Sequence, residues 1–118
     1  MVDIVLAEDI PLQQSLIQYF MEEYDVCIKC AKDGDEAVWF ASVYNPDIAI
    51  LDLNMPVKDG FQATKQIKCI NSNIKIIIST ADVSEKSIEK AIEKGADDYL
   101  IKPYTKQDLM ESIESVIE

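Results

Sequence analysis

The chain alternates short apolar runs with longer segments in which apolar residues recur three or four positions apart, and this alternation constrains its fold more than any other feature. Short runs of this kind predict strands, whereas the longer spacing predicts helices with one buried face. We expect strands at residues 4–7, 26–31, 48–53, 74–80 and 98–101, each followed by a helix.

Residues that begin or end helices stand at the boundaries of these segments. Asp33-Gly34 precedes the second predicted helix, and Gly95 ends the fourth. Thr105, with Asp108 three positions later, resembles the capping box that opens a helix. These boundaries fall where a strand–helix unit needs them.

Strands that alternate with helices pair in parallel, because each helix carries the chain back to the same end of the sheet. The nearly continuous apolar runs at residues 48–53 and 74–78 suit central strands that are covered on both faces. The predicted fold is a doubly wound α/β domain with a five-stranded parallel sheet. With 118 residues the chain is long enough for one such domain and too short for two, so residues 1–118 are expected to form a single domain.

Charge and composition argue against several classes of protein. A net charge of -11 repels the phosphates of nucleic acids, so we expect no direct binding of DNA or RNA. A hydrophobic content of 48% with 28% charged residues is typical of a globular protein, and no apolar run is long enough to cross a membrane. The first residues lack the pattern of a signal peptide, and we expect a cytoplasmic location.

Cys27 and Cys30 have the C-x-x-C spacing of some redox and metal sites. They fall in the predicted strand at residues 26–31, where side chains three positions apart point to opposite faces. The chain has no histidine to help complete a zinc site. We therefore interpret both cysteines as structural.

Polar side chains of complementary chemistry lie at the carboxyl ends of four predicted strands. These ends share one edge of a parallel sheet, which is where doubly wound domains bind their ligands. Three carboxylates, a hydroxyl and an ammonium are expected to converge there: Glu8, Asp9, Asp52, Thr80 and Lys102.

Three neighbouring carboxylates repel one another unless a cation joins them. Mg²⁺ prefers oxygen ligands and commonly bridges carboxylates to a phosphate, so the pattern predicts a site that handles phosphate. Asp52 could attack phosphorus to form an acyl phosphate. Lys102 would then offset the charge of the incoming group, and Thr80 would offer a hydroxyl to it.

Each of these residues also has a simpler interpretation. Glu8 and Asp9 could cap the first helix, and Asp52 could form a turn. Thr80 could be an ordinary strand residue, and Lys102 a solvated charge. Because four strand ends supply mutually complementary groups, a shared site is the better interpretation.

With these residues identified, the chain resembles the response regulator receiver family from residue 4 to its last helix. The matching motifs are specific and stand in the family's order. They are the acidic pair Glu8-Asp9, the acceptor segment Leu51-Asp52-Leu53-Asn54-Met55-Pro56 with Gly60 following, the switch segment Ser79-Thr80-Ala81, and Lys102-Pro103. One departure is Lys58, where many members carry an apolar residue.

The resemblance implies a flavodoxin-like (βα)5 fold with strand order 2-1-3-4-5. It also implies a Mg²⁺ ion held by Asp9, Asp52 and the main-chain carbonyl of Asn54. Glu8 would act on a water molecule bound to that metal.

The resemblance further implies that Asp52 is the phosphorylated residue and that Thr80 and Lys102 serve catalysis and switching. Tyr99 matches the family's switch aromatic, although it could equally be a half-buried strand residue. The Lys102–Pro103 peptide bond is expected to be cis.

As a two-component response regulator, the chain would take a phosphoryl group from a histidine kinase or a histidine phosphotransfer protein. The donor would dock beside Ile10, Pro11 and Leu12, although Leu12 could equally be a core residue. The surface of the fourth helix, fifth strand and fifth helix would then signal to a downstream protein effector. Asn54 and Asp82 would tune dephosphorylation, and we expect the phosphorylated form to be short-lived.

Such a domain catalyses only its own phosphorylation and dephosphorylation, so we do not expect an enzyme in the usual sense. One alternative is a phosphatase of the haloacid dehalogenase type, but these enzymes need a second aspartate where this chain has Asn54. A degenerate receiver and a flavodoxin-type cofactor binder fit less well. The chain is either a single-domain regulator or a receiver excised from a longer one.

Overall fold

The computed structural model describes residues 1–117, in which five strands alternate with five helices. The strands are β1 (Val2–Ala7), β2 (Val26–Ala31), β3 (Ile48–Asp52), β4 (Lys75–Thr80) and β5 (Asp98–Ile101). The helices are α1 (Pro11–Met21), α2 (Gly34–Tyr44), α3 (Gly60–Ile70), α4 (Glu85–Lys94) and α5 (Lys106–Ile117). None of these helices is long and apolar enough to span a membrane.

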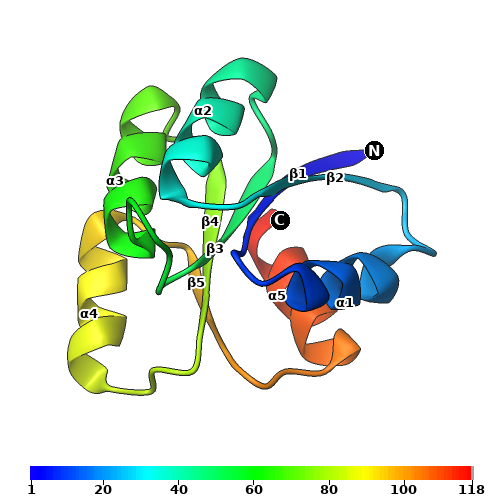
Figure 1. Ribbon diagram of the computed structural model, residues 1–118. Coiled ribbons are helices and arrows are strands. Elements are labelled where there is room, and N and C mark those ends of the chain that lie inside the picture. The colour runs from blue at the N-terminus through cyan, green and yellow to red at the C-terminus, as the bar shows by residue number, and fades with distance from the viewer. Residues whose placement is uncertain (118) are drawn as a thin grey trace.

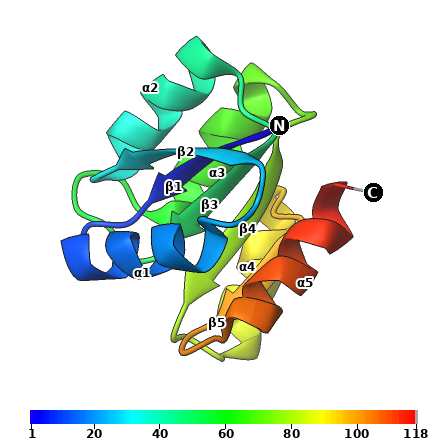
Figure 2. The same cartoon turned by 90° about the vertical axis from the view of Figure 1, so that its right-hand side faces the viewer.

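The strands of residues 1–117 form one sheet in the order β2-β1-β3-β4-β5, and every neighbouring pair is parallel. Helices α1 and α5 cover one face of the sheet, and α2, α3 and α4 cover the other (Figures 1 and 2). The predicted doubly wound α/β fold and its strand order are confirmed. The direction of winding reverses between β1 and β3, so the usual place for a ligand lies outside their carboxyl ends.

The side chains of β3 alternate between the two halves of the core. Ile48 and Ile50 pack in the half that α1 and α5 cover, together with Leu109 of α5. Ala49 and Leu51 pack in the half that α2, α3 and α4 cover. All five residues of β3 are buried, which explains why its sequence is an almost unbroken apolar run.

β2 and β5 have the predicted bounds, whereas the boundaries of the other three strands differ from the sequence prediction by one or two residues. β1 begins two residues earlier than predicted, because Val2 already pairs with Val26 of β2. β3 ends at Asp52, one residue early. β4 begins one residue late, because the main-chain nitrogen of Ile74 donates to the Asn71 carbonyl in a turn.

The predicted caps of the second, fourth and fifth helices are present. Asp33 accepts a hydrogen bond from the backbone of α2, and Gly95 adopts a left-handed conformation after α4. Thr105 and Asp108 each accept a backbone N–H bond from the other at 3.0 Å, which is a complete capping box. By contrast, α1 has Ile10 at its N-cap position and no side-chain cap, so the alternative that Glu8 and Asp9 cap it is wrong.

The two cysteines of the C-x-x-C spacing point to opposite faces of β2. Cys30 packs in the half of the core beneath α1 and α5, where its sulfur accepts a hydrogen bond from Gln18 at 3.0 Å. Cys27 instead lines a surface hollow beside Tyr44 of α2. Both thiols are free, as the structural interpretation requires.

Candidate functional site

The candidate site lies at the carboxyl edge of the sheet. Glu8 follows β1, Asp52 ends β3, and Lys102 follows β5. Because these strands are parallel, their ends meet at one edge, and the three side chains come into direct contact there.

Lys102 joins the two buried carboxylates. Its Nζ lies 2.9 Å from Glu8 Oε1 and 3.0 Å from Asp52 Oδ2. Glu8 is 2% exposed and Asp52 is 7% exposed, so these charges interact in surroundings where water screens them weakly. The ammonium group lowers the repulsion between the two carboxylates.

Burial and charge shift the pKa values of the paired groups. The pKa of Glu8 is raised because burial penalises its charged form and Asp52 repels it, and these effects outweigh Lys102. The pKa of Lys102 is also raised: burial lowers it, but hydrogen bonds to Glu8 and Asp52 more than compensate. Both pKa values can be raised at once, because Lys102 has two carboxylate partners whereas Glu8 has one ammonium partner and a carboxylate neighbour.

Asp9 completes a cluster of three carboxylates. One carboxylate oxygen from each of Glu8, Asp9 and Asp52 lies within 4.8 Å of the others. Asp9 is exposed, so a cation could reach the cluster from solvent. These ligands are hard oxygen donors of the kind that Mg²⁺ prefers, and the cluster therefore fits this ion.

Asp52 also organises the loop that follows it. Its Oδ1 accepts a hydrogen bond at 3.1 Å from the main-chain nitrogen of Asn54. Asp52 can therefore form the turn and belong to the acidic cluster at the same time, because its carboxylate uses different oxygens for Asn54 and Lys102.

Thr80 and Asp82 form a local network at the end of β4. Thr80 is buried, and its hydroxyl oxygen accepts a hydrogen bond at 3.1 Å from the Asp82 nitrogen. The Asp82 carboxylate accepts from Ser84 at 2.8 Å and from Ser87 at 2.6 Å, at the start of α4. These two bonds lower the pKa of Asp82. The Asp82 carboxylate is therefore held at the N-terminal end of α4.

Tyr99 connects β5 to the same loop. Its hydroxyl donates to the main-chain carbonyl of Asp82 at 2.7 Å, and its ring packs in the half of the core that α2, α3 and α4 cover. Burial, and then the nearby charge of Asp82, raise the pKa of Tyr99. The Lys102–Pro103 peptide is cis, as the family resemblance implied.

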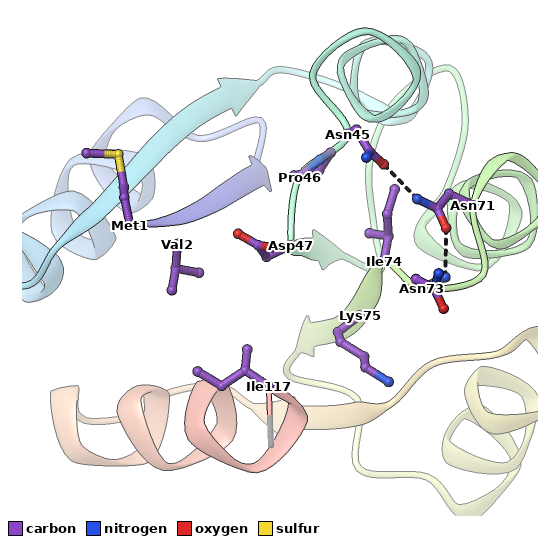
Figure 3. Close-up of a pocket in the computed structure, with 10 residues that line it drawn as sticks. All are labelled: Met1, Val2, Asn45, Pro46, Asp47, Asn71, Asn73, Ile74, Lys75 and Ile117. Carbon is purple, nitrogen blue, oxygen red and sulfur yellow. Dashed lines mark hydrogen bonds between the residues drawn. The ribbon is translucent and has the colours of Figure 1, made fainter.

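A surface pocket lies far from these groups, at the opposite edge of the sheet (Figure 3). It has a volume of about 470 Å³, and its asparagine side chains already bond to neighbours: Asn71 donates to Asn45 at 2.7 Å and accepts from the Asn73 nitrogen at 2.9 Å. Its polar groups do not form a cluster of titratable side chains like that around Asp52.

Ser79 was identified from the sequence only as part of the switch segment and Tyr104 was not singled out, yet both residues lie beside this site. Ser79 pairs with Asp52 in the sheet register, and the charges of Lys102, Glu8 and Asp52 all affect the pKa of Tyr104. The sequence does contain one sign that Ser79 is unusual, because this serine interrupts the isoleucine run of β4 just before Thr80.

The model of the response regulator receiver domain family matches residues 4–114. The chain belongs to this family. Among curated relatives, the receiver is 33% identical to the chemotaxis protein CheY of Halobacterium salinarum over 114 residues, which cover 97% of this chain and 95% of that protein. It is 30% identical to CheY of Listeria monocytogenes over 97% of both chains.

Among solved structures, the receiver resembles the receiver domain of the sensor histidine kinase PA1611 from Pseudomonas aeruginosa, which has a magnesium ion in its active-site cleft. The two are 29% identical with a TM-score of 0.89, over 98% of this chain and 97% of that one. Vibrio cholerae CheY4 shares the fold at 24% identity, with a TM-score of 0.92 and 98% of each chain covered. The receiver is thus of the CheY type.

Proposed function

We propose that the receiver takes a phosphoryl group from a partner phosphohistidine onto Asp52 and signals the change to a protein partner. The observation that carries this proposal is the contact of Lys102 with Asp52 and Glu8 at 3.0 and 2.9 Å, beside the carboxylate of Asp9. A nucleophilic carboxylate, a cation beside it and an acidic cluster are the parts that phosphoryl transfer to aspartate needs.

In the transfer step, an Asp52 oxygen attacks phosphorus as the bond between phosphorus and the donor's imidazole nitrogen breaks. The imidazole leaves with that electron pair, and the product is an aspartyl phosphate. Lys102 already contacts Asp52, so its ammonium group is close enough to offset the charge of the incoming phosphoryl oxygens. The Thr80 hydroxyl turns from the Asp82 nitrogen to a phosphoryl oxygen.

Asp9, Asp52 and the main-chain carbonyl of Asn54 would hold Mg²⁺, with Glu8 bonded to one of its waters. The ion supplies positive charge that neutralises the phosphoryl oxygens. The separation of at most 4.8 Å among the carboxylate oxygens of Glu8, Asp9 and Asp52 supports this assignment.

The switch would run through the loop between β4 and α4. Both Thr80 and Tyr99 bond to Asp82 in this loop, through its nitrogen and its carbonyl respectively. Movement of Thr80 toward a phosphoryl group would break one of these bonds, and Tyr99 would turn inward. The surface formed by α4, β5 and α5 would change its equilibrium between two states, which a protein effector reads.

The phosphoryl donor, a histidine kinase or a histidine phosphotransfer protein, would dock beside α1. Ile10 and Leu12 are 49% and 80% exposed there, so the alternative core role for Leu12 does not hold. A hollow of about 330 Å³ lies between Leu16 of α1 and Tyr104, next to Lys102, and offers further apolar surface near the site. We place the receiver in the cytoplasm with its donor.

Asn54 and Asp82 would tune hydrolysis of the aspartyl phosphate. Asn54 is exposed at the rim of the site, where a small amide leaves room for water. Because Asp82 is tied to Ser84 and Ser87, its influence would act through the position of the loop. A phosphorylated form with a very long lifetime would contradict this assignment.

NMR with beryllofluoride, a phosphoryl mimic, tests the proposal. With Mg²⁺ present, amide signals near Asp52 and across α4, β5 and α5 should shift in the wild type and stay unchanged in Asp52→Asn. The absence of shifts in the wild type would overturn the proposal. Turnover of a phosphatase substrate in molar excess over the protein would favour the haloacid dehalogenase type instead.

A further inference from the structure

Ser79 carries an unpaired hydroxyl inside the protein. The residue is 3% exposed, and its Oγ has no hydrogen-bond partner within residues 1–117. Buried polar groups are nearly always paired in folded proteins, so an unpaired one needs an explanation.

The sheet register puts this hydroxyl next to the site. Ser79 lies beside Asp52 of β3 and Leu100 of β5. Ile77, two residues earlier in β4, packs in the half of the core beneath α1 and α5. Because side chains alternate along a strand, Ser79 points to that same face.

Lys102 crosses β4 on this face. It follows β5, and its Nζ reaches Asp52 on β3, so its side chain extends across the intervening strand near Ser79. An ammonium group has three N–H donors, and within the described chain two of them go to Glu8 and Asp52. The third is available to a further acceptor.

Tyr104 lies beside Ser79 and Lys102. Its ring packs in the half of the core beneath α1 and α5, and its side chain lines the hollow beside Lys102. Burial raises the pKa of Tyr104, while donation from the Ser79 hydroxyl and the Lys102 charge act to lower it. The contact between Ser79 and Tyr104 does not reach hydrogen-bond geometry here, and a Ser79 hydroxyl that donates to Tyr104 keeps its lone pairs for an N–H of Lys102. Ser79, Lys102 and Tyr104 therefore lie close enough to influence one another.

A divalent cation would compete with Lys102 for the same carboxylates. Lys102 bonds two of the three residues in the acidic cluster. An ion bound there repels the ammonium and takes up the carboxylate oxygens, so Lys102 needs another acceptor at short range. This step rests on the proposed function, since it assumes that the cluster binds Mg²⁺.

We propose that Ser79 Oγ is the acceptor to which the Lys102 ammonium turns when a divalent cation binds at the acidic cluster of Glu8, Asp9 and Asp52. Ser79 is then a positioning residue, which acts through Lys102. Without the Ser79 hydroxyl, the displaced ammonium of the partly exposed Lys102 loses this acceptor, and cation binding becomes weaker.

Calorimetric titration of the full chain with Mg²⁺ tests this role. Ser79→Ala should weaken binding about ten-fold, the size expected for losing a hydrogen bond to a charged group. Ser79→Thr keeps the hydroxyl and should bind nearly as the wild type does. Urea unfolding of each variant checks that the fold is kept, which we expect because Ser79→Ala only removes an unpaired hydroxyl.

The decisive comparison uses Lys102→Met as background. If Ser79 acts through Lys102, then adding Ser79→Ala to Lys102→Met should leave Mg²⁺ affinity unchanged. The inference is overturned if Ser79→Ala lowers Mg²⁺ affinity equally in the wild-type and Lys102→Met backgrounds, or if it lowers the affinity in neither. Both of these results leave the proposed function standing. Failure of the wild type to bind Mg²⁺ overturns both.

Discussion

Lys102 Nζ lies 3.0 Å from Asp52 Oδ2, so the ammonium already touches the carboxylate that we assign as the phosphoryl acceptor. The same nitrogen lies 2.9 Å from Glu8 Oε1. Lys102 therefore offsets part of the negative charge of the acidic cluster, and in the function that we propose it would also contact the incoming phosphoryl group.

Lys102→Met should separate these two effects. Removal of the ammonium takes away a competitor for the carboxylates, so Mg²⁺ should bind about ten-fold more tightly. Phosphorylation by acetyl phosphate should nevertheless be impaired, because nothing offsets the phosphoryl charge. Calorimetry and a phosphorylation time course measure the two quantities, with exposed Lys65→Met of α3 as control. Weaker Mg²⁺ binding with wild-type phosphorylation would contradict both roles.

Asp9→Asn should weaken Mg²⁺ binding at least about ten-fold, because it removes one charged ligand from a cluster of three. The fold should be unaffected, since Asp9 is exposed and does not cap α1. Glu89→Gln on the exposed side of α4 removes the same charge elsewhere and serves as the matched control. Equal losses in the two variants would point to net charge rather than a ligand.

Tyr99→Phe should lower the free energy of unfolding by about 1 kcal/mol, the usual net value of a neutral hydrogen bond. The bond lost is the one from its hydroxyl to the Asp82 carbonyl at 2.7 Å. Urea denaturation measures this change, with exposed Tyr19→Phe as a control that should be neutral. A neutral Tyr99→Phe would show that the bond does not hold the loop between β4 and α4.

Asp82 should make the stability depend on pH in the acid range. Hydrogen bonds from Ser87 and Ser84 lower its pKa in the folded protein below the ordinary value of 3.8. The ionised carboxylate thus stabilises the fold above pH 3.8, and this contribution disappears as the pH falls through the lower, folded-state pKa. The stability gap between wild type and Asp82→Asn should shrink over that interval in urea titrations. A gap that stays constant with pH would contradict the assignment.

The fold and the centre of the site could be predicted because both follow from short-range patterns. Alternating strands and helices imply a parallel sheet, and a parallel sheet brings the ends of β1, β3 and β5 to one edge. That reasoning alone brings Glu8, Asp52 and Lys102 together, and the structure has all three in contact.

Contacts between distant side chains could not be predicted in this way. Lys58, a departure from the family pattern, forms an ion pair with Asp35 of α2 at 2.9 Å and a hydrogen bond with Gln66 of α3. Gly34 was expected only at the start of the second helix, but the structure also leaves no space for a side chain there, because a Cβ would lie 2.1 Å from the Lys58 carbonyl oxygen. Such contacts depend on packing between helices, which local patterns do not encode.

Intact mass spectrometry after incubation with acetyl phosphate and Mg²⁺ tests the central claim most directly. The wild type should gain one phosphoryl group, which is lost again in alkali as expected of an acyl phosphate. Asp52→Asn should gain none, and chelation of the metal should abolish the gain in the wild type. An unmodified wild type, or an Asp52→Asn variant that is phosphorylated to the same extent, would contradict the assignment of Asp52 as the acceptor.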